Sequence, residues 1–289
     1  MTSNEKLMEE WARRYADRIA KEREESKGSP ETPGVKDGED DGEAERNRRN
    51  VITPSGDAFF LEGDYGRAFL EEYNRIVERE YSGNSVLKVL NWDEAQSVVT
   101  GSNDYSVVLA NKIFRDRGEK VRTATPADLA EILKTGKLEL KGHYADAGLV
   151  LRTFSGVNEY LAGVLYGDIK QKSGKDIEMP FMINLSDLEL RIDNNSPSKL
   201  AFVSLETVNP IHSDKFNHSN AQKKFNVTDK YGLPEFVKNG KRTWYTRNDG
   251  LARFYLYWVL DLYSVVGDLQ DSDADGRVVV VRCAGGASS

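Results

Sequence analysis

The chain has 289 residues, of which 39% are hydrophobic and 30% are charged, so most of it is expected to form soluble, globular structure. Its formal net charge of −7 argues against broad electrostatic attraction to nucleic acid or to an anionic membrane surface. The single cysteine, Cys283, excludes an internal disulfide and a thiolate zinc cluster.

The N-terminal residues are too charged for a secretory signal, and no apolar run approaches the roughly 20 residues that a membrane-spanning helix needs. The sequence therefore predicts no membrane span. By default we expect the protein to stay in the cytoplasm, with display on a surface or on a particle left open.

The N-terminal part is predicted to form an amphipathic helix over residues 4–27 and a flexible linker over residues 28–50. In the first segment an apolar side chain recurs every four residues, at Leu7, Trp11, Tyr15 and Ile19. Such a helix packs on its own domain, or it docks onto a partner or a second copy of the chain. The second segment is rich in Gly, Pro and acidic residues. The globular domain is expected to cover residues 51–289.

Helices and one strand are predicted in the first part of this domain. Amphipathic patterns indicate helices over residues 66–81 and 102–117, and residues 87–93 are typical of a strand. The next helix has clear local signals: Thr125 at the N-cap, Pro126 at the first helical position, and Asp128 in the capping-box position. It should end at Gly136.

After about residue 147 the pattern changes to strands. The candidates are residues 148–154, 187–192, 200–208 and 242–246, a long alternating stretch over 254–266, and 276–282. Helices followed by many short strands predict an α+β domain.

Near the C-terminus, an acidic cluster has the first half of a calcium loop. Asp271, Asp273 and Asp275 alternate and are followed by Gly276, as in an EF-hand. The twelfth position is Arg282, where the motif needs a bidentate glutamate, and a strand-like run replaces the expected helix. A solvated turn is the favoured interpretation, and loose calcium binding is the alternative.

Other chemical motifs are missing from the sequence. His143, His212 and His218 do not have metal-ligand spacing, and we expect them on the surface. There is no phosphate-binding glycine loop and no nucleophile elbow, and nothing evident activates Cys283. The sequence therefore predicts neither an enzyme, nor a metal site, nor a cofactor.

Residues 254–266 carry the more informative pattern. If this segment is extended, Leu256, Trp258, Leu260 and Leu262 form a row suited to a core. The opposite face mixes tyrosine, valine and Asp261, which is the composition of a binding surface. A strand buried on both faces is the alternative, but Asp261 makes it awkward because an unpaired buried carboxylate is costly.

The composition of residues 245–276 points the same way, because this stretch contains no Lys, Glu or Met. Codons that began as AAC and had both adenines randomised can give Tyr, Asp, Val, Ser, Ala, Gly or Phe, among others, but never Lys, Glu, Met, Gln or Trp. Trp258 and Gln270 would then be fixed positions.

The segment over residues 244–282 resembles the C-terminal variable region of proteins diversified by diversity-generating retroelements. Its sequence is WYTRNDGLARFYLYWVLDLYSVVGDLQDSDADGRVVVVR. The matching motifs are WYTR (244–247), GLAR (250–253), the alternating leucines and GRVVVVR (276–282), and the helix beginning TPADLAEIL (125–133) is also similar. The specific match covers about the last fifth of the chain.

The resemblance implies a C-type-lectin-like fold related to formylglycine-generating enzymes, with helices packed on a small, mostly antiparallel sheet. A reverse transcriptase would introduce adenine-specific errors at the 3′ end of the gene, and the altered side chains would be displayed to a macromolecular ligand, a protein first of all. The variable, ligand-facing positions carried over are Asn248, Asp249, Phe254, Tyr255, Tyr257, Val259, Asp261, Tyr263, Val265, Val266, Asp271, Asp273 and Asp275.

Tyr255, Tyr257 and Tyr263 would be aromatic anchors. Polar specificity would come from Asp261, Asp271 and Asp273. Two alternatives are a calcium-dependent lectin and an interaction domain that is not diversified. An enzyme of the formylglycine-generating type is disfavoured, because a lone Cys283 cannot supply the cysteine pair of that chemistry.

Overall fold

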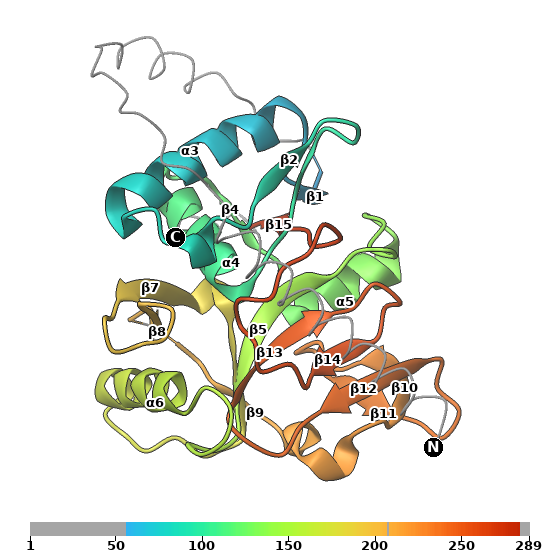
Figure 1. Ribbon diagram of the computed structural model, residues 1–289. Coiled ribbons are helices and arrows are strands. Elements are labelled where there is room, and N and C mark those ends of the chain that lie inside the picture. Colours follow the sequence, from blue (N-terminus) through green and yellow to red (C-terminus); the bar gives the residue numbers. More distant parts are fainter. Residues whose placement is uncertain (1–55, 207, 284–289) are drawn as a thin grey trace, which may run out of the picture. The chain divides into compact units, whose positions relative to one another are not determined.

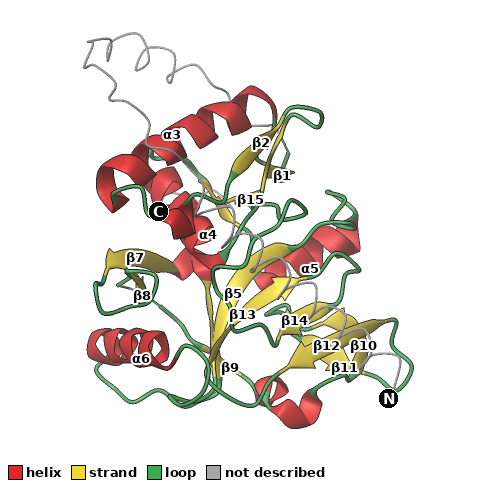
Figure 2. Ribbon diagram, in the orientation of Figure 1, coloured by secondary structure: helices red, strands yellow, loops and turns green. Residues whose placement is uncertain are grey.

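The computed structural model describes residues 56–206 and 208–283, which lie within one compact unit, residues 48–289 (Figure 1). The predicted helix at residues 4–27 and the linker at 28–50 lie outside the described residues. Within the described part, helices and strands are mixed as expected for an α+β domain (Figure 2). The four α-helices there are α3 (Gly63–Tyr81), α4 (Asp104–Asp116), α5 (Pro126–Thr135) and α6 (Glu159–Ser173).

Helix α5 confirms the local signals read from the sequence. The Thr125 side chain accepts the Asp128 N–H at 3.3 Å, and the Asp128 carboxylate accepts the Thr125 N–H at 2.7 Å. Pro126 stands at the first position, where no intrahelical N–H is needed. Gly136 ends the helix in the left-handed conformation, with φ 66°.

The largest sheet has eight strands, in the order β11-β10-β12-β14-β13-β5-β6-β9. Its neighbouring strands are antiparallel, apart from the parallel pair β12 and β14. This sheet is larger than the small sheet expected from the sequence. Its strands are β5 (Ala145–Leu151), β6 (Phe181–Asn184), β9 (Ile211–His212), β10 (Lys224–Thr228), β11 (Pro234–Phe236), β12 (Arg242–Thr246), β13 (Leu251–Leu256) and β14 (Leu262–Ser264).

Three smaller sheets complete the described part. A three-stranded sheet has the order β1-β15-β4, and two hairpins pair β2 with β3 and β7 with β8. These strands are β1 (Ala58–Phe60), β2 (Asn91–Asp93), β3 (Val98–Thr100), β4 (Val121–Thr123), β7 (Leu188–Ile192), β8 (Leu200–Ser204) and β15 (Val279–Arg282).

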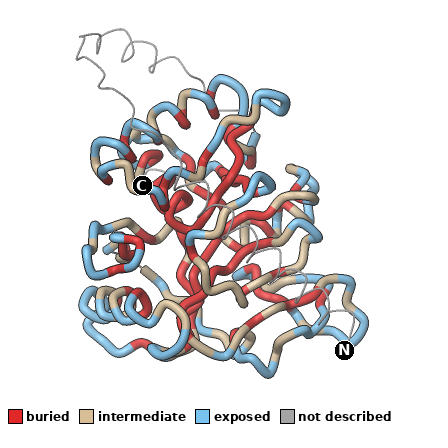
Figure 3. Tube along the Cα trace, viewed as in Figure 1, coloured by how far each residue is buried: buried red, intermediate tan, exposed pale blue. Residues whose placement is uncertain are grey.

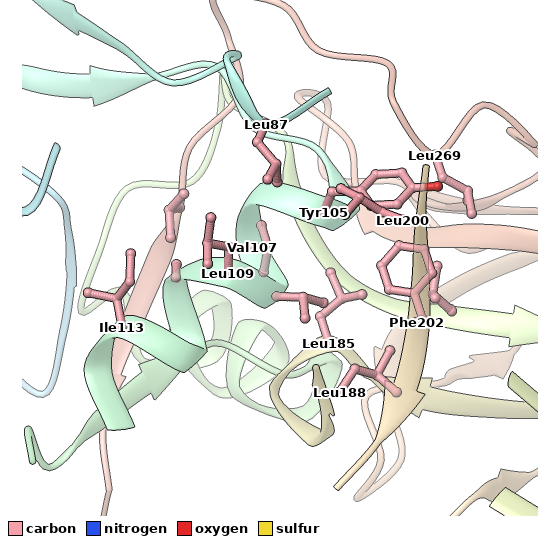
Figure 4. Close-up of a cluster of buried hydrophobic side chains, with 14 of the residues drawn as sticks. Leu87, Tyr105, Val107, Leu109, Ile113, Leu185, Leu188, Leu200, Phe202 and Leu269 are labelled. Carbon is pink, nitrogen blue, oxygen red and sulfur yellow. The ribbon is translucent and has the colours of Figure 1, made fainter. Parts of the chain in front are cut away.

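Helix α4 is central to the larger of two hydrophobic clusters (Figure 4). Its Val107, Leu109 and Ile113 are buried, and its Tyr105 ring packs on Phe202 of β8 at a centroid distance of 4.5 Å. Strands β5 and β13 are buried over their whole length, as Figure 3 shows for the centre of the molecule. Their side chains contribute both to this cluster and to a second one that contains Trp244. Because a buried interior is close-packed, the centre of this sheet holds the ends of its strands in fixed positions.

Several predicted elements need correction. The strand expected at residues 87–93 is a short 3₁₀ turn at Ser85–Leu87, followed by a strand only at Asn91–Asp93. The strand expected at 276–282 begins at Val279. Helix α6 falls in a region that was predicted to hold strands only.

The largest error in the prediction concerns residues 254–266. They were expected to be one extended strand, but they form a hairpin. After β13 the chain reverses: the Leu260 N–H donates to the Tyr257 carbonyl, and the Tyr257 N–H donates to the Asp261 carbonyl. Leu260 has φ 70°, and β14 then runs back beside β13. The predicted Leu/Trp row is therefore not one face: Leu256 and Leu262 are buried, but Trp258 is 48% exposed.

None of the helices among the described residues is both long enough and apolar enough to cross a membrane.

Glycine at position 250 is required by both conformation and space, which gives a stability test. Gly250 has φ 64°, and a Cβ there would lie 2.2 Å from the Val157 carbonyl oxygen. Gly118 has nearly the same φ, 66°, with nothing within 4 Å. Gly118→Ala should lower the free energy of unfolding by about 1–2 kcal/mol, the cost of the left-handed conformation alone. Gly250→Ala should lower it by clearly more, in urea unfolding of both variants. Equal losses would contradict the close approach at residue 250.

Candidate ligand-binding face

A row of tyrosines crosses three adjacent strands of the large sheet. Tyr245 of β12 lies opposite Tyr263 of β14, and Tyr263 lies opposite Tyr255 of β13. The rings of Tyr245 and Tyr263 stack with centroids 4.3 Å apart, and those of Tyr255 and Tyr263 are 5.4 Å apart. Because residues in register on neighbouring strands point to the same face, the three side chains form one continuous aromatic surface.

The hairpin turn adds two more aromatic rings to this surface. Tyr257 contacts Tyr263 at a centroid distance of 4.7 Å, and Trp258 meets Tyr257 edge-to-face at 5.9 Å. Trp258 and Val259 are about half exposed, at 48% and 51%. The aromatic surface thus runs from the buried Tyr255 outward to solvent at the turn.

An acidic loop, residues 271–275, borders the aromatic surface and is held by Tyr144. The Tyr144 hydroxyl accepts the Asp273 N–H at 3.0 Å and donates to the Ser102 carbonyl at 2.8 Å. The Tyr144 ring lies edge-to-face against Tyr255 at 6.3 Å. The loop is therefore tied to the same aromatic cluster as the strands.

Beneath the tyrosines lies a buried ion cluster centred on Arg253. Its Nε and Nη2 donate to one oxygen of Asp146, at 3.0 and 2.5 Å. Its Nε also lies 3.5 Å from Asp104, and its Nη1 lies 3.5 Å from Asp271. The guanidinium stands 4.9 Å from the Tyr255 ring centroid, within cation–π range.

The ion cluster shifts the protonation of its members. Burial, then repulsion from Asp146, raises the pKa of Asp104 well above its ordinary 3.8. Burial also raises the pKa of Asp146, although the attraction and hydrogen bonds of Arg253 oppose it. Neither Asp104 carboxylate oxygen has a hydrogen-bond partner. Asp104 is thus the most costly member of the cluster to ionise.

Most of the thirteen residues predicted from the sequence are at least partly exposed. The exceptions are Phe254 and Tyr255, which are buried. Phe254 points into the core and packs on Trp244 with ring centroids 5.5 Å apart, so it is not ligand-facing. Tyr255 lies on the aromatic side but under its neighbours, at 5% exposure.

Nine of the thirteen predicted residues fall into two groups. Tyr255, Tyr257 and Tyr263 belong to the aromatic surface, and the three loop aspartates lie in the acidic loop beside it. A second group lies around Arg247: its guanidinium donates to the Asp249 carboxylate at 2.9 and 2.7 Å and to the Val265 carbonyl at 3.0 Å. Asn248 is the exposed residue between them.

Two further predicted residues are held by backbone contacts. Asp261 is half-buried and accepts the Thr243 N–H at 2.6 Å, so its carboxylate is not unpaired as the sequence argument assumed. Val266 accepts the Arg253 N–H through its carbonyl at 3.2 Å.

The sequence reasoning missed Tyr144, Tyr245 and the buried acids Asp104 and Asp146. Tyr245 had a usable signal, since alternation in the strand WYT places it opposite the two core-facing residues. The other three come from distant segments, and no local pattern marks them.

The metal and nucleophile candidates have ordinary surroundings. Among residues 56–206 and 208–283, no group of three or more His, Cys, Asp or Glu side chains could hold a metal ion. Asp273 accepts the Asp275 N–H at 2.9 Å, an Asx-type contact that shapes the turn. His212 and His218 are exposed, and so is Cys283, while His143 packs against Phe60 at 5.4 Å.

Comparisons with protein-family models, with curated proteins and with solved structures gave no match to this chain.

The Arg253–Asp146 pair should be essential for stability. Asp146→Ala would leave a buried guanidinium without its closest partner, and we expect it to lower the free energy of unfolding by about 3–5 kcal/mol. Asp57→Ala, which breaks the exposed pair with Lys137, is the matched control and should have a far smaller effect. Chemical denaturation measures both. A small effect of Asp146→Ala would show that the cluster is not a structural centre.

The raised pKa of Asp104 predicts a pH dependence. Because the folded protein holds a proton there above the unfolded pKa of 3.8, stability should fall as the pH rises through the raised folded value. Asp104→Asn removes this contribution. Its melting temperature should therefore fall less than that of the wild type between about pH 4 and about pH 8. Other groups with shifted pKa values, among them Asp146, Asp261 and His143, contribute to the slope that remains, and identical slopes would contradict the assignment.

Proposed function

We propose that this protein binds a macromolecular ligand, a protein first of all, through the aromatic surface formed by Tyr245, Tyr255, Tyr257, Trp258 and Tyr263. The observation that carries the proposal is the register of three tyrosines on three neighbouring strands. Tyrosine gives a large, amphipathic contact area at low cost in side-chain entropy. Because these tyrosines stand on a sheet whose centre is buried, their contact surface is preorganised for binding.

We further propose that residues 245–276 are diversified by a retroelement on a C-type-lectin-like scaffold. The support is the sequence resemblance, whose segments WYTR, GLAR and GRVVVVR fall on or beside β12, β13 and β15. The absence of Lys, Glu and Met from the stretch that supplies all five residues of this surface supports it as well. Residues in this stretch that point into the core, such as Phe254, would then be fixed.

The fixed positions follow from burial. Phe254, Leu256 and Leu262 are buried in the second cluster, where most substitutions would leave a cavity or overpack. Tyr257, Val259 and Asp273 face solvent at least in part and could change without that cost. On this proposal, the buried residues hold the fold and the solvent-facing residues contact the ligand.

Truncation of individual tyrosines tests whether the surface is displayed. Tyr257→Ala should change the melting temperature little and should abolish ligand binding. Tyr255→Ala removes a buried ring and should cost about 3–5 kcal/mol of unfolding free energy. Tyr231→Ala is the binding control, since Tyr231 is a 42% exposed tyrosine on the β10–β11 hairpin. A large loss of stability for Tyr257→Ala would indicate a core role instead.

Sequencing the 3′ end of the gene from many cells of its natural population tests diversification directly. We expect differences confined to about codons 245–276, at presumptive template adenines and at positions whose side chains reach solvent. Scattered silent differences, or frequent changes at Phe254 and Leu256, would contradict the proposal.

A further inference from the structure

A cavity of about 600 Å³ is lined by helix α5, strand β10 and the turn that follows this strand. Arg242 of β12 and Leu260 of the hairpin turn complete the lining. Arg242 and Tyr245 are three residues apart on β12, so their side chains point to opposite faces of the sheet. A volume of this size is typical of a small-molecule site. The cavity is therefore a candidate site separate from the aromatic surface.

The Arg242 side chain is held at two points and keeps its outer end open. Its Nε donates to the Leu260 carbonyl at 2.5 Å, and its guanidinium carbon lies 4.5 Å from the centroid of the Phe225 ring. Within residues 56–206 and 208–283, nothing accepts a hydrogen bond from its Nη1 or Nη2, and no carboxylate forms an ion pair with it. Because Arg242 lines the cavity, these two nitrogens present a fork of N–H donors to a ligand there.

Arg242 is a half-buried cation that lacks a bonded counter-ion. Burial lowers the pKa of Arg242 from 12.5 to about 10, against the attraction of Asp261, so the guanidinium stays charged at neutral pH. The Asp261 carboxylate accepts the Thr243 N–H at 2.6 Å instead of pairing with Arg242. An acidic group on a ligand would supply the partner that the fold leaves out.

The two acidic residues in the lining have partners of their own. Glu131 pairs with Lys134 on α5 at 3.4 Å, and Asp229 pairs with Lys215 at 2.7 Å. Lys230 adds a further cation to the lining. The cavity thus has an excess of positive charge, although the chain as a whole has a net charge of −7. This local charge favours an anionic ligand.

The rest of the lining is mainly apolar and restricts the kind of anion. Ala127, Leu133 and Leu260 form part of it, and the two leucines also pack against the second hydrophobic cluster. An apolar wall favours a ligand with an aliphatic chain. A singly charged, planar carboxylate matches one guanidinium fork, whereas a phosphate dianion would be repelled by Glu131 and Asp229.

We propose that this cavity binds an organic carboxylate, whose charged group accepts the Nη1 and Nη2 hydrogens of Arg242 and whose aliphatic chain lies against Leu133 and Leu260. A free aliphatic acid and the C-terminal end of a peptide carry this same chemistry. Apart from Leu260, the residues that line the cavity lie outside residues 245–276. Chains diversified in that stretch would therefore keep this site.

The test is a titration of the full chain followed through the backbone amide NMR signals of Ala130, Val227 and Leu260. The probes are isocaproate and Nα-acetyl-leucine, each compared with its neutral amide and with inorganic phosphate. We expect saturable shifts with at least one acid and at least about tenfold weaker binding of its amide, because the charge-assisted hydrogen bonds are lost. Saturation by isocaproate assigns the site to a free acid, and saturation by Nα-acetyl-leucine alone assigns it to a chain end.

Two variants locate the binding in the cavity. Arg242→Gln should weaken it about tenfold, because the charged fork is lost. Arg191→Gln, which changes an exposed arginine on β7, is the matched control and should leave it unchanged. Ala130→Phe should fill the cavity and abolish binding while Arg242 stays in place, so it decides the question if Arg242→Gln does not fold.

Four results would each overturn the inference. They are the absence of saturable shifts with both acids, equal affinity for the amides, saturation by inorganic phosphate, and undiminished binding in Ala130→Phe or in a folded Arg242→Gln protein. None of them bears on the tyrosine variants or on the population sequencing, so this inference and the proposed function can fail separately.

Discussion

The structure around the candidate face depends on one buried ion cluster. Arg253 joins strand β13 to Asp146 of β5, to Asp104 at the start of helix α4 and to Asp271 of the C-terminal loop. Four segments that are separated in the sequence thereby meet at Arg253, which precedes Tyr255 by two residues in β13. Desolvating these groups is costly, and removal of one partner costs more than the pair gains, which ties each segment to the others.

The position of β14 is the second constraint. This strand lies between β12 and β13, with a parallel ladder on one side and an antiparallel ladder on the other. Only this insertion places Tyr263 between Tyr245 and Tyr255. Had residues 254–266 formed one extended strand, Tyr255 and Tyr263 would stand eight residues apart along it, too far for their rings to touch.

Local signals made part of this fold predictable. Helix α5 has a capping box, a first-turn proline and a terminal glycine, and all of them act as read from the sequence. The turn at residues 257–261 has no such signal: its left-handed residue is Leu260, where glycine or asparagine would have marked a hairpin. Helix α6 was missed because Gly163 and Gly167 interrupt its interior and weaken the helical pattern.

The residues of the candidate site were likewise predictable only where their signal was local. The tyrosines of 254–266 were found because alternation and composition are local properties. Their underlying partners Tyr144, Asp146 and Asp104 are brought in by long-range packing, which a single sequence does not reveal. Trp258 was placed in the core because it alternates with the leucines of the predicted row, but the chain reversal at residues 257–261 exposes it.

The paired edges of β14 have a consequence for the proposed diversification. Its strand position is set by hydrogen bonds of the main chain, which every amino acid except proline can make. Exchange of the Tyr263 side chain would change what the surface attracts without changing the atoms that hold the strand. If position 263 varies as proposed, the variants would keep the main-chain pairing of β14, and loss of the ring contacts with Tyr245, Tyr255 and Tyr257 would change their stability.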